Sequence, residues 1–443
     1  MGEPGHWHTK PASLALLSGR RRADHDEVTH GARTRSEYGI ALALALGPAI
    51  ALGLARFGYA LLLVPMRASL HWSFTTSGAL STVNSVGYLA GALLAGPVIR
   101  WWGARLAFLM GTGLSALSML ATAGASNPLA LFGLRTGAGV SGAVCFIAGA
   151  ALVAKVSPPG SVRRAAALLS IYPAGIGVGI VISGAVVPWL LAAISSPSAW
   201  RWGWVLFGGL GLLGFVITVP AAVSCDEPPV RARTRERWPV TQLAPLLTCY
   251  VLFGVGYIGY LTFVVAYLQG RGASPGFITA FWIVLGAMVI AGAFGWAPAI
   301  GRLRAGRAPS LIMGVVCLGT LLPLLSRSSI AAIASAVIVG SSVVALVAAV
   351  MAVSRRSLPP QHWASAITVL TVGFAAGQCL GPLLAGVLAD HPAGLEAGLY
   401  ASAGLLAVGS IVALAQRHLD GNLSNAVAPG PALAKTRSQG GGS

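Results

Sequence analysis

The sequence is dominated by apolar stretches long enough to cross a lipid bilayer. Cutting the chain at its polar residues gives twelve of them, at 39–66, 76–99, 104–124, 128–153, 165–194, 203–224, 244–268, 275–299, 308–326, 329–353, 364–389 and 395–416. A hydrocarbon core about 30 Å thick requires about 20 apolar residues in a helix. The stretches are about twice too long for barrel strands and lack a two-residue alternation. We therefore expect an all-α membrane protein with twelve transmembrane helices.

The composition supports a bilayer as the main partner of the chain. Hydrophobic residues make up 56% of the sequence and charged residues only 9%, against roughly 25% charged residues in soluble domains. A net charge of +18 would suggest nucleic acid if it were carried by a folded polar domain. The basic residues lie instead in short loops between apolar stretches, so we expect no nucleic-acid partner.

The distribution of basic residues predicts the orientation. Of the 29 Lys and Arg residues, 23 fall on the side of the two termini, four on the other side, and Arg56 and Arg135 inside helices. Cytoplasmic loops carry the excess of Lys and Arg in membrane proteins. Both termini are therefore expected in the cytoplasm. Only three of the basic residues are Lys, and this bias, with abundant Ala and Gly, is typical of a GC-rich bacterial genome, so we expect a bacterial inner (plasma) membrane.

The longest internal polar segment divides the chain into two similar halves. We expect a disordered cytoplasmic tail at 1–38, a six-helix bundle at 39–224, a linker at 225–243, a second six-helix bundle at 244–416 and a second disordered tail at 417–443. Three weak internal repeats have offsets of 201, 203 and 198 residues, for example Gly53–Tyr59 with Gly254–Tyr260. Near-equal offsets indicate a duplicated unit, and repeated six-helix halves are typical of transporters.

Several motifs resemble those of the major facilitator superfamily. Gly96, Arg100, Gly103 and Arg105 resemble the superfamily's loop between helices two and three, although Arg100 stands where an Asp is usual. The segment 131–143, with Arg135 and Gly139, resembles its fourth-helix motif, and Gly377 with Pro382 resembles its pattern in helix eleven. The first helix, 53–59 followed by Leu63 and Pro65, resembles the bacterial YbfB/YjiJ-type group. The resemblance implies two halves that rock around a central site, and it places Arg135 at a position linked in that family to cation or proton coupling. The residues expected to serve conformational change are Gly96, Arg100, Gly103, Arg105, Gly139, Gly377 and Pro382.

Two arginines are predicted to lie deep in the membrane. Arg56 is about 15 Å and Arg135 about 11 Å from the outer ends of their helices, at 1.5 Å per residue. Buried charges are costly and usually face the interior of the bundle or a wet cavity. All eleven acidic residues and all eight histidines fall in tails, loops or helix ends, so neither arginine has a carboxylate partner in the membrane. The partner could be backbone carbonyls, water or a transient anion, and a planar guanidinium suits a carboxylate or phosphate.

Polar and aromatic residues in the same layer are candidates for the rest of a substrate site. The predicted substrate-binding residues are Arg56, Tyr59, Arg135, Tyr257, Tyr260, Asn84 and Gln378, with Tyr88, Trp282, Ser341 and Ser342 as further lining residues. For each of these alone, apart from the two arginines, ordinary helix packing is the simpler interpretation.

These features favour a secondary active transporter of a small anionic organic solute, acting as a monomer without a cofactor. An exporter of drugs or amphipathic compounds with the same fold is the alternative. A membrane enzyme is disfavoured because general acid-base chemistry would need acids or histidines in or near the membrane. A channel is disfavoured because the sequence shows no charged ring or selectivity filter. The five cysteines are scattered without metal-ligand spacing, so neither a disulfide framework nor a metal site is predicted.

Overall fold

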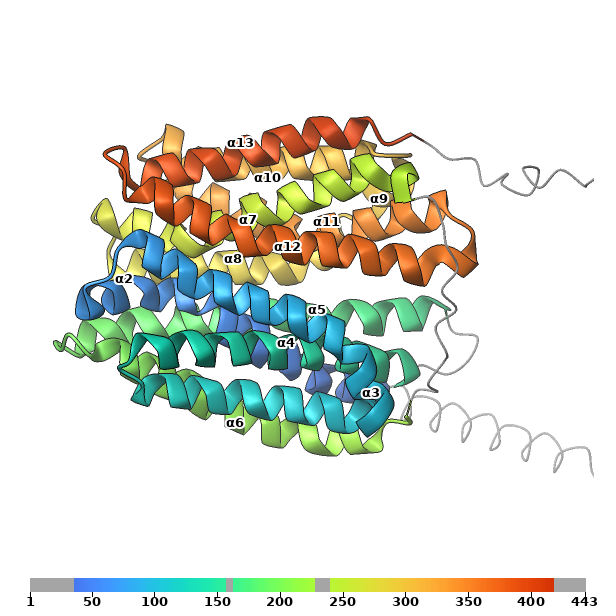
Figure 1. Ribbon diagram of the computed structural model, residues 1–443, viewed down its shortest axis with the longest axis horizontal. Coiled ribbons are helices and arrows are strands. Elements are labelled where there is room, and N and C mark those ends of the chain that lie inside the picture. The colour runs from blue at the N-terminus through green and yellow to red at the C-terminus, as the bar shows by residue number, and fades with distance from the viewer. Residues whose placement is uncertain (1–35, 157–161, 228–239, 418–443) are drawn as a thin grey trace, which may run out of the picture.

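The structure is a computed structural model, and it describes residues 36–156, 162–227 and 240–417. The predicted tails and most of the predicted linker lie outside these described residues. Within them the chain is helical and contains no strand. Eleven helices are long and apolar enough to cross a membrane, and they run along one common direction in Figure 1.

The order of the elements follows the predicted stretches closely. The first long helix, Ser36–Leu70, contains the π-helix η1 (Ala49–Phe57) and α2 (Tyr59–Leu70). The other elements are α3 (Phe74–Gly124), α4 (Pro128–Val156), α5 (Val162–Ala193), α6 (Ala199–Ser224), η2 (Val240–Leu243), α7 (Ala244–Gly270), α8 (Pro275–Gly295), α9 (Ala297–Arg302), α10 (Arg307–Leu325), α11 (Ser329–Ser357), η3 (Pro360–His362), α12 (Trp363–Ala389) and α13 (Gly394–Leu414).

Two predicted stretches, 76–99 and 104–124, form the single element α3. Its 51 residues would span about 77 Å as a straight helix, more than twice the hydrocarbon thickness. Non-helical angles occur at Gly103, with φ 79° and ψ 161°, and the ribbon of α3 runs to one end of the bundle and back in Figure 1. The turn at Gly103 therefore separates the two predicted stretches without a loop.

A carboxylate from a distant part of the chain covers this turn. Glu227 accepts hydrogen bonds from the backbone N–H of Ala104 at 2.8 Å and of Arg105 at 3.1 Å. The Arg105 guanidinium donates to the carbonyl of Cys225 at 2.7 Å. Free N–H groups at the start of a helical segment favour a negative charge. Glu227 thus supplies a carboxylate beside the loop in which Arg100 stands instead of the usual acid.

We expect Gly103→Ala to destabilise the protein by about 1–3 kcal/mol, because its backbone angles belong to a region open essentially to glycine alone. An added Cβ would also lie 2.9 Å from Oε1 of Glu227. Gly96→Ala is the matched control, since a Cβ at Gly96 meets nothing within 4 Å. Thermal melting in detergent should show a lower midpoint for the first variant only. Equal midpoints for the two variants would contradict this account of the turn.

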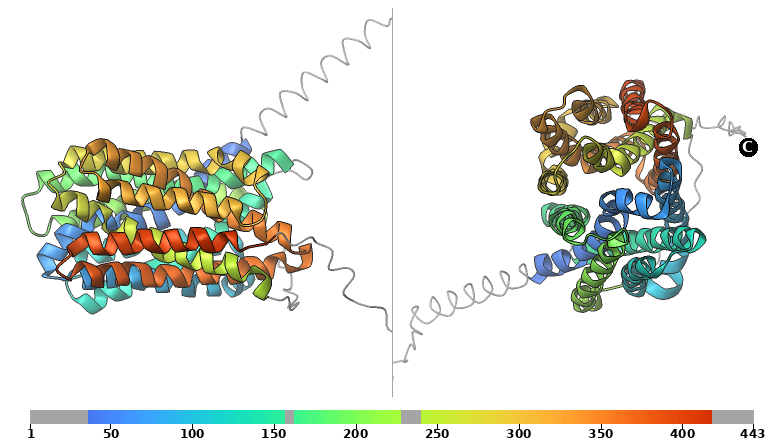
Figure 2. Two further views of the ribbon diagram at one scale, coloured as in Figure 1. Left: turned by 90° about the horizontal axis from the view of Figure 1, so that it is seen from above. Right: turned by 90° about the vertical axis from the view of Figure 1, so that its left-hand side faces the viewer.

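The elements gather into an N-terminal group, η1 to α6, and a C-terminal group, α7 to α13, which lie one above the other in the end-on view on the right of Figure 2. Contacts between the groups are made by α5 with α8, α3 with α12 and α2 with α7. We call the end of the bundle where residues 36 and 417 lie the tail end (Figure 1). The turns after α2 and α12 lie at the opposite end.

Backbone-to-backbone packing joins the groups along these contacts. A Cβ added to Gly78 of α3 would strike the carbonyl of Pro382, and one added to Gly177 of α5 would strike that of Gly286. Trp282 of α8 donates to the hydroxyl of Ser183 at 3.1 Å. Such close approach is possible only where small residues face each other.

At the opposite end, one carboxylate bridges the groups. Asp390, directly after α12, accepts hydrogen bonds from the backbone N–H groups of Phe74 and Thr75, both at 2.8 Å. Partial burial raises the pKa of Asp390, but hydrogen bonds from Thr75 and Phe74 outweigh it and hold the pKa below its usual value. The carboxylate stays charged at neutral pH and caps the start of α3 from the other group.

The Asp390 contact should stabilise the protein in a pH-dependent way. Because the pKa is lowered on folding, its contribution is complete above the unfolded pKa of about 3.9 and is lost as the pH falls through the folded value. Asp390→Ala should therefore lower the melting temperature by the same amount from pH 5 to pH 8, with a difference that shrinks below about pH 4. A difference that disappears between pH 5 and pH 8 would rule out the carboxylate as the cause.

Candidate functional site

A cavity of about 390 Å³ lies between the two groups of helices. Residues of η1, α3, α4 and α5 line one side, and residues of α7, α8, α11 and α12 line the other. The lining reaches from Arg56 to Leu169, near the start of α5, and to Met351, near the end of α11. Both of those ends belong to the tail end, so the cavity extends from the middle of the bundle toward the tail end.

Arg56 is the only charged side chain among the described residues that line this cavity. It is 8% exposed, and its Nη2 donates to the hydroxyl of Ser85 at 2.9 Å and to Oε1 of Gln378 at 3.0 Å. Its guanidinium lies 5.1 Å from the ring centre of Tyr88. Nε of Arg56 is buried without a hydrogen-bond partner in the described part of the chain. The guanidinium is thus oriented by neutral groups and keeps donors unused.

Gln378 connects Arg56 to the other group of helices. Its Oε1 accepts from Arg56, and its Nε2 donates to the hydroxyl of Tyr257. Arg56 of η1 and Tyr257 of α7 are the positions matched by the internal repeat, so the structure brings the two repeat positions to one hydrogen-bonded chain. This chain crosses from one group to the other at the end of the cavity.

A π-helix places Arg56 in its position. In η1 the backbone widens, and the N–H of Gly58 bonds to the carbonyl of Gly53 five residues earlier, at 3.0 Å. Gly53 packs so tightly on α5 that an added Cβ would lie 2.7 Å from the carbonyl of Ile176. Segments of π-helix are rare and are frequently found at functional sites. The extra residue per turn changes which side chains of the first helix face the cavity.

Stacked aromatic rings form one wall of the cavity. The rings of Tyr250 and Phe374 lie 4.4 Å apart at 8°, and those of Phe374 and Tyr257 lie 5.7 Å apart at 11°. All three residues line the cavity. Behind them, Phe253 stacks on Tyr257 at 4.6 Å. The facing walls are aliphatic, with Ile176, Ile180, Leu285, Val289, Val339 and Val343 among them.

The structure separates the seven predicted substrate-binding residues. Arg56, Tyr257 and Gln378 line the cavity, and Tyr59, Tyr260, Asn84 and Arg135 do not. The Tyr59 hydroxyl donates to the carbonyl of Ser77 at 2.9 Å, and the Tyr260 hydroxyl bonds to that of Ser335. Both rings are buried inside their own group of helices. They lie three residues from the cavity-lining positions 56 and 257, on other faces of their helices.

Arg135 is a packed residue rather than a cavity residue. It is 1% exposed, and its Nη1 donates to the carbonyl of Ala55 at 2.5 Å. Its guanidinium lies 5.4 Å from the ring centre of Tyr59 and 5.1 Å from that of Trp204. Asn84 donates to the backbone carbonyl of Arg135 at 2.9 Å. The predicted second anion contact is therefore enclosed by aromatic rings and backbone.

The residues predicted to serve conformational change lie in three settings. Gly139 and Gly377 lie where an added Cβ would strike a neighbouring helix backbone, at Asn84 and Val251 respectively. Pro382 packs its carbonyl against Gly78 of the other group. Gly96 and Arg100 are exposed, and Gly103 and Arg105 meet Glu227.

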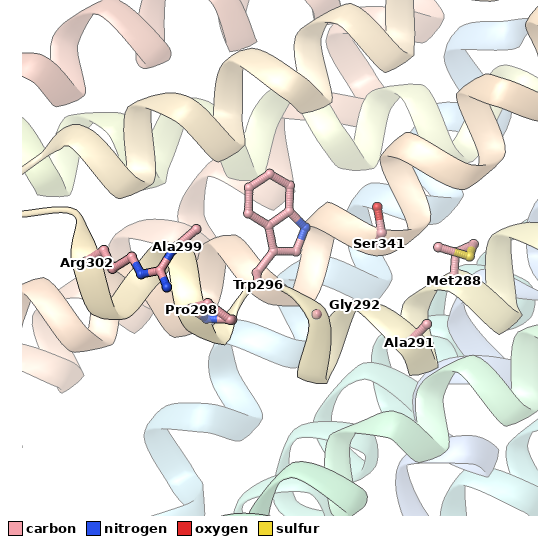
Figure 3. Close-up of a pocket in the computed structure, with 9 residues that line it drawn as sticks. Met288, Ala291, Gly292, Trp296, Pro298, Ala299, Arg302 and Ser341 are labelled. Atoms are coloured by element: carbon pink, nitrogen blue, oxygen red, sulfur yellow. The ribbon is translucent and has the colours of Figure 1, made fainter.

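A second hollow lies beside the break between α8 and α9, and its residues are drawn in Figure 3. Its volume is about 590 Å³, and Met288, Trp296, Arg302 and Ser341 are among its lining residues. Arg302 is exposed, and every lining residue comes from α8, α9, α11 or the junction between α8 and α9. The hollow is thus a surface groove of the C-terminal group. Ser341, predicted near the substrate, lies here, while Ser342 and Trp282 are buried outside the cavity.

The aromatic wall of the cavity and the contacts of two carboxylates could not be predicted from the sequence. The stacked wall involves Tyr250 and Phe374, which look like ordinary apolar positions, and the roles of Glu227 and Asp390 depend on contacts more than 100 residues away in sequence. Within the described ranges no group of three or more His, Cys, Asp or Glu residues could hold a metal ion, and all five cysteines are free.

Comparison with known proteins places this geometry in context. The family profile described as "Uncharacterised MFS-type transporter YbfB" matches residues 48–414. A comparison with curated proteins finds no match. Among solved structures, a bacterial homologue of the human lysosomal transporter Spinster, inward-facing and occupied, has a TM-score of 0.66 at 16% identity, covering 85% of this chain and 95% of that one. A variant of the nucleoside transporter NupG has a TM-score of 0.65 at 13% identity, covering 85% and 99%. At these identities the likeness concerns the fold alone.

Proposed function

This chain belongs to the YbfB-type family of the major facilitator superfamily, and we propose that it carries a small organic anion across the membrane by alternating access. The helical, membrane-spanning architecture and the transporter folds of its neighbours support transport rather than catalysis. The solute occupies the cavity between the two groups of helices. The protein acts as a monomer in the bacterial inner membrane.

In this proposal α3 crosses the bilayer twice, so the eleven long helices make twelve crossings in two halves, 39–224 and 244–416. The tail end faces the cytoplasm, as the bias of basic residues predicts. A cavity that extends toward the tail end then belongs to the inward-open state. Asp390 and the contacts of α5 with α8 and α3 with α12 close the outer side in this state.

The observation that carries the proposal is the lone guanidinium at the end of the cavity. Arg56 has neutral hydrogen-bond partners, an unused buried donor and no acidic neighbour among the lining residues. A charge in the membrane interior is costly without a counter-charge. An anionic solute supplies that counter-charge, and its oxygen atoms accept hydrogen bonds from the guanidinium. A cationic solute would be repelled and would find no lining carboxylate.

The alternative function is export of amphipathic compounds, which the aliphatic and aromatic walls favour. The two functions differ in the role of charge. An exporter of hydrophobic compounds would bind neutral and cationic molecules through its walls, with little help from Arg56. An anion carrier would select by the charged end.

A thermal-shift panel on the purified full chain tests the proposal. Carboxylates, phosphates, amino acids, neutral sugars and cationic drugs are compared, because a bound solute stabilises the fold by mass action. We expect stabilisation by members of the anionic classes and its loss in Arg56→Gln. Stabilisation by cationic drugs that survives in Arg56→Gln would support the exporter instead.

A further inference from the structure

The cavity that the proposed function assigns to an anion has its charged side chain at one end, together with three polar side chains. Arg56, Gln378, Tyr257 and Tyr88 meet there, and Ser85 bonds to Arg56 from behind. Arg carries five N–H donors, and the hydrogen bonds of Arg56 to Ser85 and Gln378 both come from Nη2. Nε is buried, so the donors offered to a small oxyanion at this end are those of Nη1. The recognition group of the solute is therefore compact and terminal.

The charge of the lining limits the solute to one negative charge. Apart from Arg56, the described lining residues include no Lys, Arg or His. A second negative charge on the solute would lie among side chains such as Val289, Val343 and Val347. Burying an ionised group without a partner is strongly unfavourable. Dicarboxylates and phosphate esters with two charges are therefore poor matches.

The walls specify the body of the solute. The rings of Tyr250, Phe374 and Tyr257 are parallel within 8–11° and continue toward the end that holds Arg56. Aromatic rings attract one another, stacked or edge to face, by more than the apolar area that they bury. Ser170 and Thr371 are the only Ser or Thr side chains among the described lining residues, and the other hydroxyl groups belong to the rings of Tyr88, Tyr250 and Tyr257. A solute body with many hydroxyl groups would lose hydrogen bonds to water and gain few from the walls. A flat apolar ring would instead contact the aromatic and aliphatic side chains.

The volume limits the size of this body. Ligand pockets are commonly about 300–1,000 Å³, and this cavity, at about 390 Å³, is near the lower limit. A one- or two-ring acid fits this range better than a lipid or a large drug.

We propose, as a refinement that rests on the proposed anion transport, that the solute is an aromatic monocarboxylate of one or two rings. Its carboxylate bonds to Arg56, and its ring lies along the wall of Tyr250, Phe374 and Tyr257. Gln378 and Tyr257 position the guanidinium and connect the bound carboxylate to the C-terminal half.

Calorimetric titration of the full chain in detergent with matched probes tests this. 2-Naphthoate is compared with its neutral amide, 2-naphthamide, with naphthalene-2,6-dicarboxylate, with acetate and with glucose 6-phosphate. We expect 2-naphthoate to bind at least tenfold more tightly than each of the others, and this preference to disappear in Arg56→Gln. The amide controls for partition of the ring into detergent.

A pair of wall variants tests the position of the ring. Phe374→Leu keeps an apolar side chain but removes the ring, and should weaken 2-naphthoate severalfold more than it weakens cyclohexanecarboxylate. Phe294→Leu is the matched control, because Phe294 is exposed and lies outside the cavity. Melting curves establish that both variants are folded. Equal losses for the flat and the saturated acid would overturn the placement of the ring.

The remaining outcomes separate this inference from the function on which it rests. If glucose 6-phosphate or the dicarboxylate binds as tightly as 2-naphthoate and Arg56→Gln abolishes that binding, anion transport stands and the aromatic monocarboxylate is overturned. If the amide binds as tightly as the acid and Arg56→Gln changes neither, both proposals fail.

Discussion

Arg56→Ala is expected to abolish anion binding and transport while leaving the fold intact. Truncating one partner of a buried, hydrogen-bonded charge pair costs about 2–5 kcal/mol of affinity, which corresponds to a loss of about 30-fold or more. Stability should change little, because the side chain borders a cavity and removal of an unpaired buried charge relieves a desolvation cost. Binding of 2-naphthoate and melting temperature, measured on the same sample, check both parts.

Two further variants sharpen this result. Arg56→Lys keeps the charge but loses the planar fork, so a carboxylate should bind more weakly than in the wild type although the protein still folds. Arg304→Ala removes an exposed arginine remote from the cavity and should bind normally. Transport by Arg56→Ala at the wild-type rate would show that the cavity does not recognise its solute by charge.

Arg135→Ala is expected to have the opposite effect, a loss of stability with little change in affinity. The side chain fills space between Tyr59 and Trp204 and bonds to the carbonyl of Ala55. Its truncation leaves a void in packed surroundings, and large-to-small core changes of this kind cost about 2–5 kcal/mol. We expect a melting temperature several degrees lower and a dissociation constant for 2-naphthoate within about threefold of the wild type, a small difference in free energy.

Arg135→Met is the matched variant, because it retains most of the volume and removes the charge. It should recover much of the stability that Arg135→Ala loses, since packing is the main contribution of this residue. The interpretation fails if Arg135→Ala melts like the wild type but binds as weakly as Arg56→Ala. Such a result would show that Arg135 contacts the substrate, as its predicted depth in the membrane suggests.

The contrast between these two arginines shows what the sequence can predict. Length and hydropathy were enough to give the helical membrane architecture, and depth within a stretch was enough to single out Arg56 and Arg135. Depth does not tell which face of a helix meets a cavity. That depends on the π-helix around Arg56 and on the packing of Trp204 over Arg135.

The details of the site were harder to predict for a related reason. Tyr257 and Gln378 were expected at the site because their polar groups lie in an apolar layer, and both line the cavity. Tyr59 and Tyr260 gave the same signal, but local partners satisfy them. Polarity at a given depth marks a need for a hydrogen bond, and only the packed structure decides whether a neighbour or a solute meets it.

The absence of an acidic partner for Arg56 among the described lining residues also has an electrical consequence. In its cavity, an empty carrier of this kind presents the unpaired charge of Arg56, and a carrier loaded with a monoanion presents none, while the charge of Arg135 stays among Tyr59, Trp204 and backbone in both. An elementary charge moved across the whole membrane is worth about 2.3 kcal/mol per 100 mV. Membrane voltage would therefore act differently on the return of the empty carrier and on the loaded passage, by the one charge that the solute neutralises. The side of the membrane to which the empty cavity opens would then depend on the membrane potential as well as on the solute gradient.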